Sequence, residues 1–420
     1  MIDLLYNLDF IHTFIILAFL VLVFLCIFFW FKPFEAVLAI LFLRPLINLS
    51  RDVKFSSGAL EVKLLWLYTI FVIFLGFQYL LINKKITVPR SLFIPYIVFF
   101  TICFISLFYT SNLFWGIGDF FRLLSSFVYF LLFYELIVDK RQAIVAIKAM
   151  ILSYLLTVPF AIYNLIAKTG FIEHNTLLRI KSTFSTPNAY ASYLVFISLS
   201  ALFAFLNKEF KNKLFFLVIF ALSFFSLILT WTRTGWIAFC VAFLIFFYLK
   251  GKRYLIIPSV AILLFCIIPP ARERFLESFQ KKEIGMSSWE WRLMVWKNLL
   301  KAFVTHPIQG FGLGSRFDVL LKFTKSKNWP HNDYIRLLIE LGLVGFFSFC
   351  SILLIFFKKM WTYISHPDPF IRELNILSLS ILSGFCVISI ATNQLTDVTM
   401  LMFVFSLLGL TLKLNQISGN

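Results

Sequence analysis

Residues 331–345 read HNDYIRLLIELGLVG, a polar start that leads into a long apolar run. Asn332 or Asp333 can cap a helix that begins here, because short side chains with an acceptor oxygen are preferred at that position. The run predicts a membrane-spanning helix over 333–357, with His331 held at its water edge. Taken alone, the pattern is explained somewhat better by an ordinary interfacial histidine without a chemical role.

The composition extends this prediction to the whole chain. Of its 420 residues 61% are hydrophobic and 14% are charged, whereas soluble proteins average about 25% charged residues. Apolar runs of roughly 20 residues recur, each long enough to cross the hydrocarbon layer, and the alternating segments of a β-barrel are absent. We expect an all-α polytopic transmembrane helical bundle of 12 or 13 spans, forming one integral membrane domain over 1–420.

The expected spans are 10–31, 33–48, 62–82, 91–109, 118–138, 143–167, 188–206, 213–230, 233–249, 254–270, 333–357, 371–391 and 397–413. A re-entrant piece is the alternative for the second, because it is short and follows Lys32-Pro33 at once. The first follows an acidic N-terminus and has no small-residue cleavage site after it, which predicts an uncleaved span.

The formal net charge is +18, and its distribution predicts an orientation. Short basic connections alternate with the other loops, at 83–90, 139–141, 207–213, 250–253 and 358–359. Because short cytoplasmic loops carry an excess of Lys and Arg, we expect these five in the cytoplasm. The remaining loops then face outward: 49–61, 110–117, 168–187, 230–233, 271–332 and 392–396.

The loop 271–332 is too long for a simple turn, which indicates a function. Its sequence SSWE at 287–290 fits a helix capping box. Three tryptophans then predict a helix that lies in the headgroup layer, apolar face down: Trp289, Trp291 and Trp296. Arg292 on this helix would lie close to the height of a lipid phosphate.

Two glycine-rich stretches have structural interpretations. The Gly342-x-x-Gly345 pair lacks bulky side chains and would let another helix approach closely. The sequence GFGLG at 310–314 suggests nucleotide binding, but no strand precedes it and no βαβ unit contains it, so the dinucleotide fingerprint fails. We expect a flexible turn there.

Disulfides, metal ions and cofactors are not expected. The outer loops contain scattered Asp and Glu but no paired motif such as Asp-x-Asp. All six cysteines fall inside apolar spans and are interpreted as small core residues: Cys26, Cys103, Cys240, Cys266, Cys350 and Cys386.

Four stretches, in order, resemble the O-antigen ligase and polymerase family of bacterial membrane glycosyltransferases. They are RIKSTFSTPNAYASY at 179–193, TWTRTGWIA at 230–238, the segment 291–315 that ends in HPIQGFGLGS, and the His-Asn of 331–332 that precedes the glycine pair by nine residues. The first 170 residues match only as generic spans. The resemblance implies a GT-C-like, metal-independent glycosyltransferase of the inner membrane, with its active site facing the periplasm.

Arg179, Arg233, Arg292 and His331 fall within these stretches and on the outer side of the predicted topology. Lys and Arg are normally enriched in the cytoplasmic loops of membrane proteins, so basic residues in outer loops are unexpected. Their presence there indicates an anionic partner. Snorkelling to lipid phosphates is the alternative for any single arginine, and it is a weaker explanation for all four together.

Glycan transfer from a polyprenyl diphosphate needs cations aimed at the phosphates and a base for the attacking hydroxyl. Arginine suits the first role because its planar fork binds phosphate oxygens in pairs. We therefore assign Arg179, Arg233 and Arg292 to the diphosphate and His331 to catalysis.

Three further residues are candidate substrate contacts. Asn188 matches the Pro-Asn of the family, and capping of its helix is the equally supported alternative. Asn332 and Asp333 could contact substrate or orient the ring of His331.

The resemblance predicts an O-antigen ligase, which moves a glycan from undecaprenyl diphosphate to lipid A–core, with membrane lipids around it and no nucleic-acid partner. An O-antigen polymerase would use the same donor, but the Arg-x10-Gly pattern of some polymerases is absent, because Tyr190 and Phe303 occupy the glycine positions. A protein O-oligosaccharyltransferase is a third possibility. A transporter or flippase is the non-enzyme rival, for which Glu340 and the Asp119–Arg122 pair are the ionisable candidates within spans.

Overall fold

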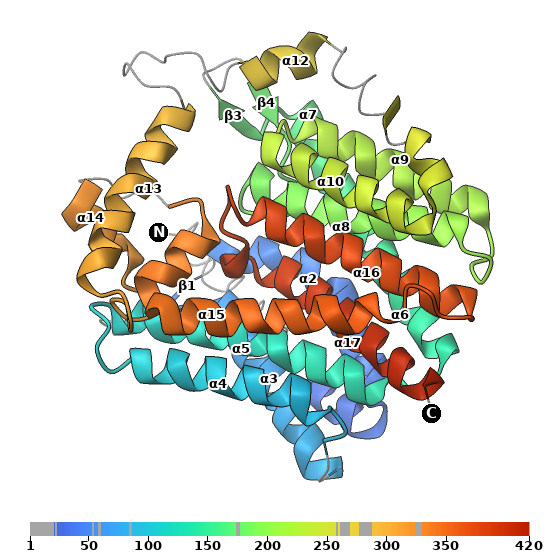
Figure 1. Ribbon diagram of the computed structural model, residues 1–420, viewed down its shortest axis with the longest axis horizontal. Helices are drawn as coiled ribbons and strands as arrows, with labels where there is room; N and C mark the ends of the chain where they lie inside the picture. Colours follow the sequence, from blue (N-terminus) through green and yellow to red (C-terminus); the bar gives the residue numbers. More distant parts are fainter. Residues whose placement is uncertain are drawn as a thin grey trace, which may run out of the picture.

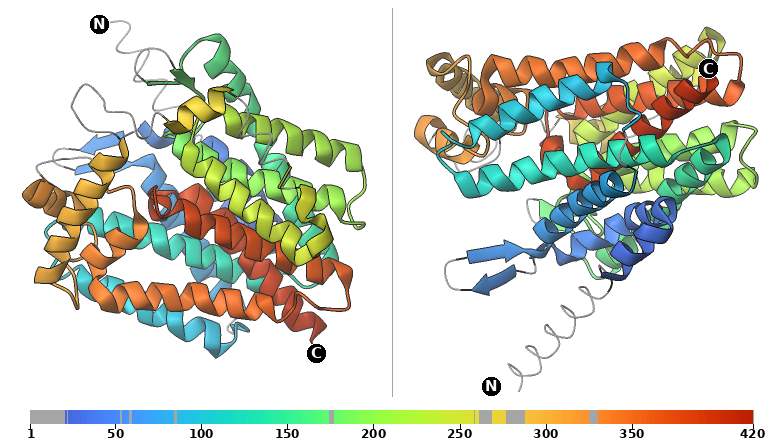
Figure 2. Two further views of the ribbon diagram at one scale, coloured as in Figure 1. Left: turned by 45° about the horizontal axis from the view of Figure 1, so that its top comes forward. Right: turned by 90° about the horizontal axis from the view of Figure 1, so that it is seen from below.

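The computed structural model describes residues 21–419, apart from 22, 53, 58–59, 84–85, 174–176, 258, 261–268, 277–287 and 325–329. Long helices run side by side through the molecule (Figure 1). Short helices and hairpins gather at one end of this bundle, and the C-terminus lies at the opposite end (Figures 1 and 2).

The long helices are α2 Pro33–Ile47, α3 Leu64–Asn83, α4 Arg90–Ser106, α5 Leu113–Leu136, α6 Lys140–Leu152, α7 Val158–Ile166, α8 Pro187–Leu206, α9 Lys213–Leu229, α10 Arg233–Lys250, α15 Asp333–Trp361, α16 Pro369–Ile388 and α17 Val398–Ser418. Among the described residues, eight helical stretches are long and apolar enough to cross a membrane, and three apolar helices are shorter. The prediction of an all-α polytopic bundle is confirmed. Most of the predicted spans 10–31 and 254–270 lies outside the described residues.

The remaining helical elements are α12 Pro269–Leu276, α13 Ser288–Thr305, α14 Arg316–Thr324 and the 3-10 turns η1 Asn48–Asp52, η2 Ser153–Leu156, η3 Lys252–Leu255 and η4 Gln394–Thr396. Strand β1 (Lys54–Ser57) pairs antiparallel with β2 (Leu60–Lys63), and β3 (Phe171–Glu173) pairs with β4 (Leu177–Arg179). The second hairpin falls in the predicted outer loop 168–187. The first begins in the loop 49–61, but β2 continues to Lys63, so the predicted span 62–82 begins two residues later, as α3 at Leu64.

The predicted span 143–167 is not one continuous helix. α6 ends at Leu152, η2 follows, and α7 begins at Val158 with Pro159 in its first turn. Proline lacks an N–H and clashes with the preceding turn, so it is tolerated best where a helix starts.

α17 lies at the centre of the bundle and is almost wholly buried. Two of its polar side chains are paired with side chains of α16. Asn415 and Asn375 of α16 exchange two amide hydrogen bonds of 2.8 and 2.7 Å, and the hydroxyls of Thr411 and Ser378 lie 2.8 Å apart. Burial of these groups is tolerated because each is satisfied.

Five charged residues form a buried network that joins α5, α14 and α15. Asp119 is bonded to Arg122, Arg316 and Arg336, and Glu340 accepts from Arg316 and Arg336 at 2.9 Å each. Arg122 is 12% exposed, and the other four are at most 1% exposed. The carboxylates that would have suited a transporter are thus engaged in an internal ion network.

α15 is broken at Gly342, which adopts φ 64° and ψ −166°. The segment 307–312 lies against this break and satisfies backbone groups on both sides of it. Four hydrogen bonds make the seam: Phe311 N to Ile339 O (2.8 Å), Gly312 N to Glu340 O (2.9 Å), Leu343 N to Pro307 O (2.8 Å) and Val344 N to Ile308 O (3.3 Å). Backbone groups freed by a helix break in a membrane protein need such partners.

One expectation about the glycines is therefore wrong. The close neighbour of Gly342 is not another helix but the non-helical segment 307–312, since a Cβ at Gly342 would lie 2.1 Å from the carbonyl oxygen of Ile308. The sequence 310–314 forms turns, as expected. It is fixed by the seam, and by bonds of Leu313 N to Ser106 Oγ and of Thr110 Oγ1 to Leu313 O.

We predict that Gly342→Ala destabilises the protein. The φ/ψ values of Gly342 are accessible almost only to glycine, and backbone strain of this kind costs about 1–3 kcal/mol before any steric clash. Thermal unfolding of the detergent-purified protein measures the effect. The control is Gly384→Ala in α16, where a Cβ would meet no atom closer than 3.2 Å. Equal melting temperatures for the two variants would contradict the seam.

Candidate functional site

Arg179, the last residue of β4, is held by two neighbouring segments. Its Nε donates to the carbonyl oxygen of Thr230 at 2.9 Å, and its Nη2 donates to Asn188 Oδ1 at 3.1 Å and Thr232 Oγ1 at 3.0 Å. The helix cap of α8 is Thr186, so the capping alternative for Asn188 is wrong. Asn188 instead orients Arg179.

Arg233 is the first residue of α10 and contacts α12. Its Nη1 donates to the carbonyl oxygen of Arg274 at 3.0 Å. Arg274 is 5% exposed, and its Nε donates in turn to the carbonyl oxygen of Trp231 at 3.4 Å. Trp231 has a left-handed backbone with φ 50°, which turns the chain sharply between α9 and α10. The sequence analysis did not select Arg274.

Arg292 brings α13 to the same place. Its Nη1 donates to the carbonyl oxygen of Ala391, in the loop between α16 and α17, at 3.1 Å. Burial, and then the positive charges of Arg233 and Arg179, lower the pKa of Arg292 to about 10. Arg292 therefore remains a cation at neutral pH. The structure brings the three predicted arginines together, from β4, α10 and α13.

His331 lies beside this cluster, just before α15. Its backbone has φ 50°, and the preceding carbonyl, of Pro330, accepts a 2.8 Å hydrogen bond from Trp296 Nε1 on α13. The Trp291 ring meets the imidazole edge-on at 6.5 Å between centroids. Burial, and then the charge of Arg292, lower the pKa of His331 to about 4, so the imidazole is neutral at pH 7.

The ring of His331 is oriented by Asn393, which the sequence analysis did not select. The Asn393 amide lies 3.3 Å from His331 Nδ1. The suggestion that Asn332 or Asp333 orients the ring is wrong. Asn332 caps α15 by accepting from Ile335 N, and Asp333 Oδ2 accepts from Leu395 N. Both side chains are buried, and their contact with substrate stays a prediction.

α13 has two apolar faces. One packs against α14 and α15 in a small core that includes Val295, Leu299, Val319 and Ile339. The other leaves Trp289, Leu293 and Leu300 between 41% and 45% exposed. The predicted helix is therefore present and carries an exposed apolar stripe, as an interfacial helix requires. Its depth in a membrane stays a prediction.

Within the described part of the chain, no group of three or more His, Cys, Asp or Glu side chains is placed to hold a metal ion. No disulfide joins any two of the described cysteines. That the chain works without a metal stays a prediction.

The sequence profile of the O-antigen ligase family matches residues 216–350. Over these residues the chain is similar to the O-antigen ligase family. The family carries out glycosyl transfer of the ligase and polymerase type, and the helices make this chain a multi-pass membrane protein. The matched region contains Arg233, Arg292 and His331, whereas Arg179 and Asn188 lie before it. A comparison with curated proteins gave no match.

Proposed function

We propose that the chain is an O-antigen ligase, which transfers a glycan from undecaprenyl diphosphate to lipid A–core at the periplasmic face of the inner membrane. The observation that carries this proposal is the convergence of Arg179, Arg233 and Arg292 beside His331. Three cations next to a neutral base, at the end of a helical bundle, suit a lipid-linked diphosphate whose tail stays in the bilayer.

In the proposed reaction a hydroxyl of the acceptor sugar attacks the anomeric carbon of the donor glycan. The bond between that carbon and the diphosphate oxygen breaks, and undecaprenyl diphosphate leaves with the electron pair. The three arginines stabilise the charge that develops on the leaving group. His331 takes the proton that the hydroxyl loses.

The low pKa of His331 in the free site is compatible with a role as general base, because a bound donor would raise that pKa. In the free site an imidazolium would lie next to the positive charge of Arg292, so proton acceptance is disfavoured. A bound diphosphate adds negative charge near the ring, which favours the protonated form and raises the pKa. His331 thus becomes an effective base only when the donor is present.

Asn393 is proposed to select the tautomer of His331. Its Oδ1 is buried without a hydrogen-bond partner, while its amide group faces His331 Nδ1. A 180° rotation of the amide lets Oδ1 accept a hydrogen bond from Nδ1–H, which satisfies both atoms. The other ring nitrogen, Nε2, is then the free acceptor for the substrate proton.

We also propose that no metal ion or cofactor takes part, because the arginines occupy the role of a divalent cation at the diphosphate. Transfer by the purified protein should then persist in excess EDTA.

Lipopolysaccharide gels of a deletion strain test the choice of acceptor. Loss of a ligase leaves bare lipid A–core together with polymerised lipid-linked chains. Accumulation of core carrying one repeat would instead assign the chain to the polymerases. Unchanged lipopolysaccharide with an unglycosylated protein would assign it to protein O-oligosaccharyltransferases.

We predict that Arg233→Lys nearly abolishes transfer. A lysine keeps the charge but loses the planar fork, and loss of one aimed donor costs on the order of 10²–10³ in rate. Arg292→Lys should behave alike. The matched control is Arg253→Lys, an exposed arginine near the end of α10. Near-normal activity of a well-expressed Arg233→Lys protein would show that positive charge alone suffices.

The pH dependence of the transfer rate of the purified enzyme tests whether His331 is the general base. Transfer should fall as pH drops through the pKa of His331, because imidazolium cannot accept the proton. The acid limb of kcat/KM, which reports the free enzyme, should lie near pH 4, and that of kcat should lie higher because the donor is bound. Coincident limbs would contradict donor-dependent activation.

Asn393→Asp extends the same test. A carboxylate beside Nδ1 favours imidazolium, so the acid limb of kcat/KM should move to higher pH. Asn393→Leu should lower kcat without that movement. Identical pH profiles for wild type and Asn393→Asp would remove Asn393 as a positioning residue.

A further inference from the structure

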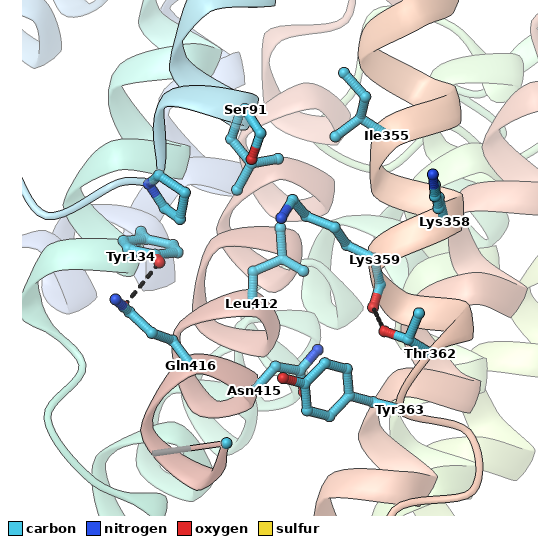
Figure 3. A pocket seen from close by; sticks show the side chains of 13 residues that line it. Ser91, Tyr134, Ile355, Lys358, Lys359, Thr362, Tyr363, Leu412, Asn415 and Gln416 are labelled. Atoms are coloured by element: carbon cyan, nitrogen blue, oxygen red, sulfur yellow. Dashed lines mark hydrogen bonds between the residues drawn. The ribbon is translucent and has the colours of Figure 1, made fainter.

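Figure 3 shows a cavity of about 650 Å³. Its lining residues place it at the end of the bundle opposite the arginines. It is formed where α4 begins and where α5, α15 and α17 end. This volume is within the range of ordinary small-ligand sites. The basic connections predict that this end faces the cytoplasm, so the cavity is separate from the proposed site of glycosyl transfer.

Two adjacent lysines of α15, Lys358 and Lys359, line the cavity. Lys359 extends from α15 toward Ser91 at the start of α4 (Figure 3). None of the thirteen described residues that line the cavity is acidic. Among the described residues no carboxylate lies within ion-pair distance of either lysine. Two cations therefore line the cavity, and no carboxylate among the described residues neutralises them.

The neighbouring groups add to this positive field. α4 runs for 17 residues, and no side chain caps its N-terminus, which carries the positive end of the helix dipole into the cavity wall. The nearby carboxylate of Glu135 is engaged by Thr87 N, Thr87 Oγ1 and Val88 N at 2.5–3.0 Å. The Nζ atom of Lys413 lies 5.2 Å from the ring centre of Tyr134, which lines the cavity. An anion is the complementary ligand.

The surroundings indicate which anion. On α15, Leu354 precedes the two lysines and is 67% exposed, and Trp361 follows them and is 56% exposed. The lysines therefore lie between an exposed apolar side chain and an exposed tryptophan. Exposed tryptophans mark the headgroup level of membranes. Leu92 and Leu412 supply an apolar wall to the cavity. The cavity thus has cations at the level of the lipid headgroups and, beside them, apolar side chains that can contact an acyl chain.

We propose that this cavity binds the phosphate headgroup of an anionic phospholipid, with Lys358 and Lys359 on the phosphate. Snorkelling lysines on an open surface would attract such lipids without a saturable site. A built cavity differs, since binding to the folded state saturates and stabilises it.

Thermal unfolding of the purified full-length protein in detergent tests the proposal, with short-chain phosphatidylglycerol as the probe. The melting temperature of the wild type should rise to a plateau. Phosphatidylcholine of equal chain length and inorganic phosphate should give no such rise. The Lys358→Gln/Lys359→Gln double variant should lose the rise.

Two further variants separate a cavity from general surface charge. Lys252→Gln/Arg253→Gln removes the same charge from η3 at the same end and should keep the rise. Ser91→Phe retains both lysines but fills the cavity, and should lose the rise. An equal loss in the η3 variant, an unaffected Ser91→Phe protein, or an equal rise with phosphatidylcholine or inorganic phosphate would overturn the proposal.

Discussion

The seam between residues 307–312 and the break in α15 is the constraint on which the rest of the site depends. A helix broken at Gly342 leaves the carbonyls of Ile339 and Glu340 without partners along the helix, and in an apolar setting this is costly. The amides of Phe311 and Gly312 supply those partners. Because the segment leads directly from α13, the same bonds fix α13 relative to α15, and hence Arg292 relative to His331.

The ion network beneath the seam strengthens this attachment. Arg316 at the start of α14 is bonded to Asp119 on α5 and Glu340 on α15. Breaking a buried ion pair by removal of one partner is strongly destabilising, because a charge is left unpaired. The loop that carries Arg292 is therefore anchored to the bundle by backbone bonds and by charge.

The arginines themselves are oriented by neutral oxygens in the contacts described above. Carbonyls of Thr230, Arg274 and Ala391 accept from Arg179, Arg233 and Arg292, respectively. Bonds to neutral oxygens fix the direction of a guanidinium and add no negative charge of their own. The mutual repulsion of the three cations is the cost of this arrangement, and a bound diphosphate would relieve it.

The sequence predicted the helices and the convergence of the basic residues, since apolar run lengths and loop charge are one-dimensional properties. The helix over 333–357 was found as Asp333–Trp361, and Arg179, Arg233 and Arg292 were assigned to one side from topology alone.

Tertiary contacts decided what the sequence could not predict. The glycine pair indicated a close approach but not that a non-helical segment makes it, and strands of three or four residues are too short to show periodicity. Asn393 was recognisable only as a polar residue in a short outer loop, and its partner became evident once α15 and α17 were adjacent.

The affinity of two single variants for undecaprenyl diphosphate in nanodiscs tests the central claim, that arginines bind the donor while His331 acts on the acceptor. We predict that His331→Ala binds within a few-fold of wild type and that Arg233→Ala binds at least about tenfold more weakly, the loss of one charge-assisted hydrogen bond. An equal loss of affinity in both variants would show that His331 is a phosphate ligand. Wild-type affinity in Arg233→Ala would contradict the account of the arginine site.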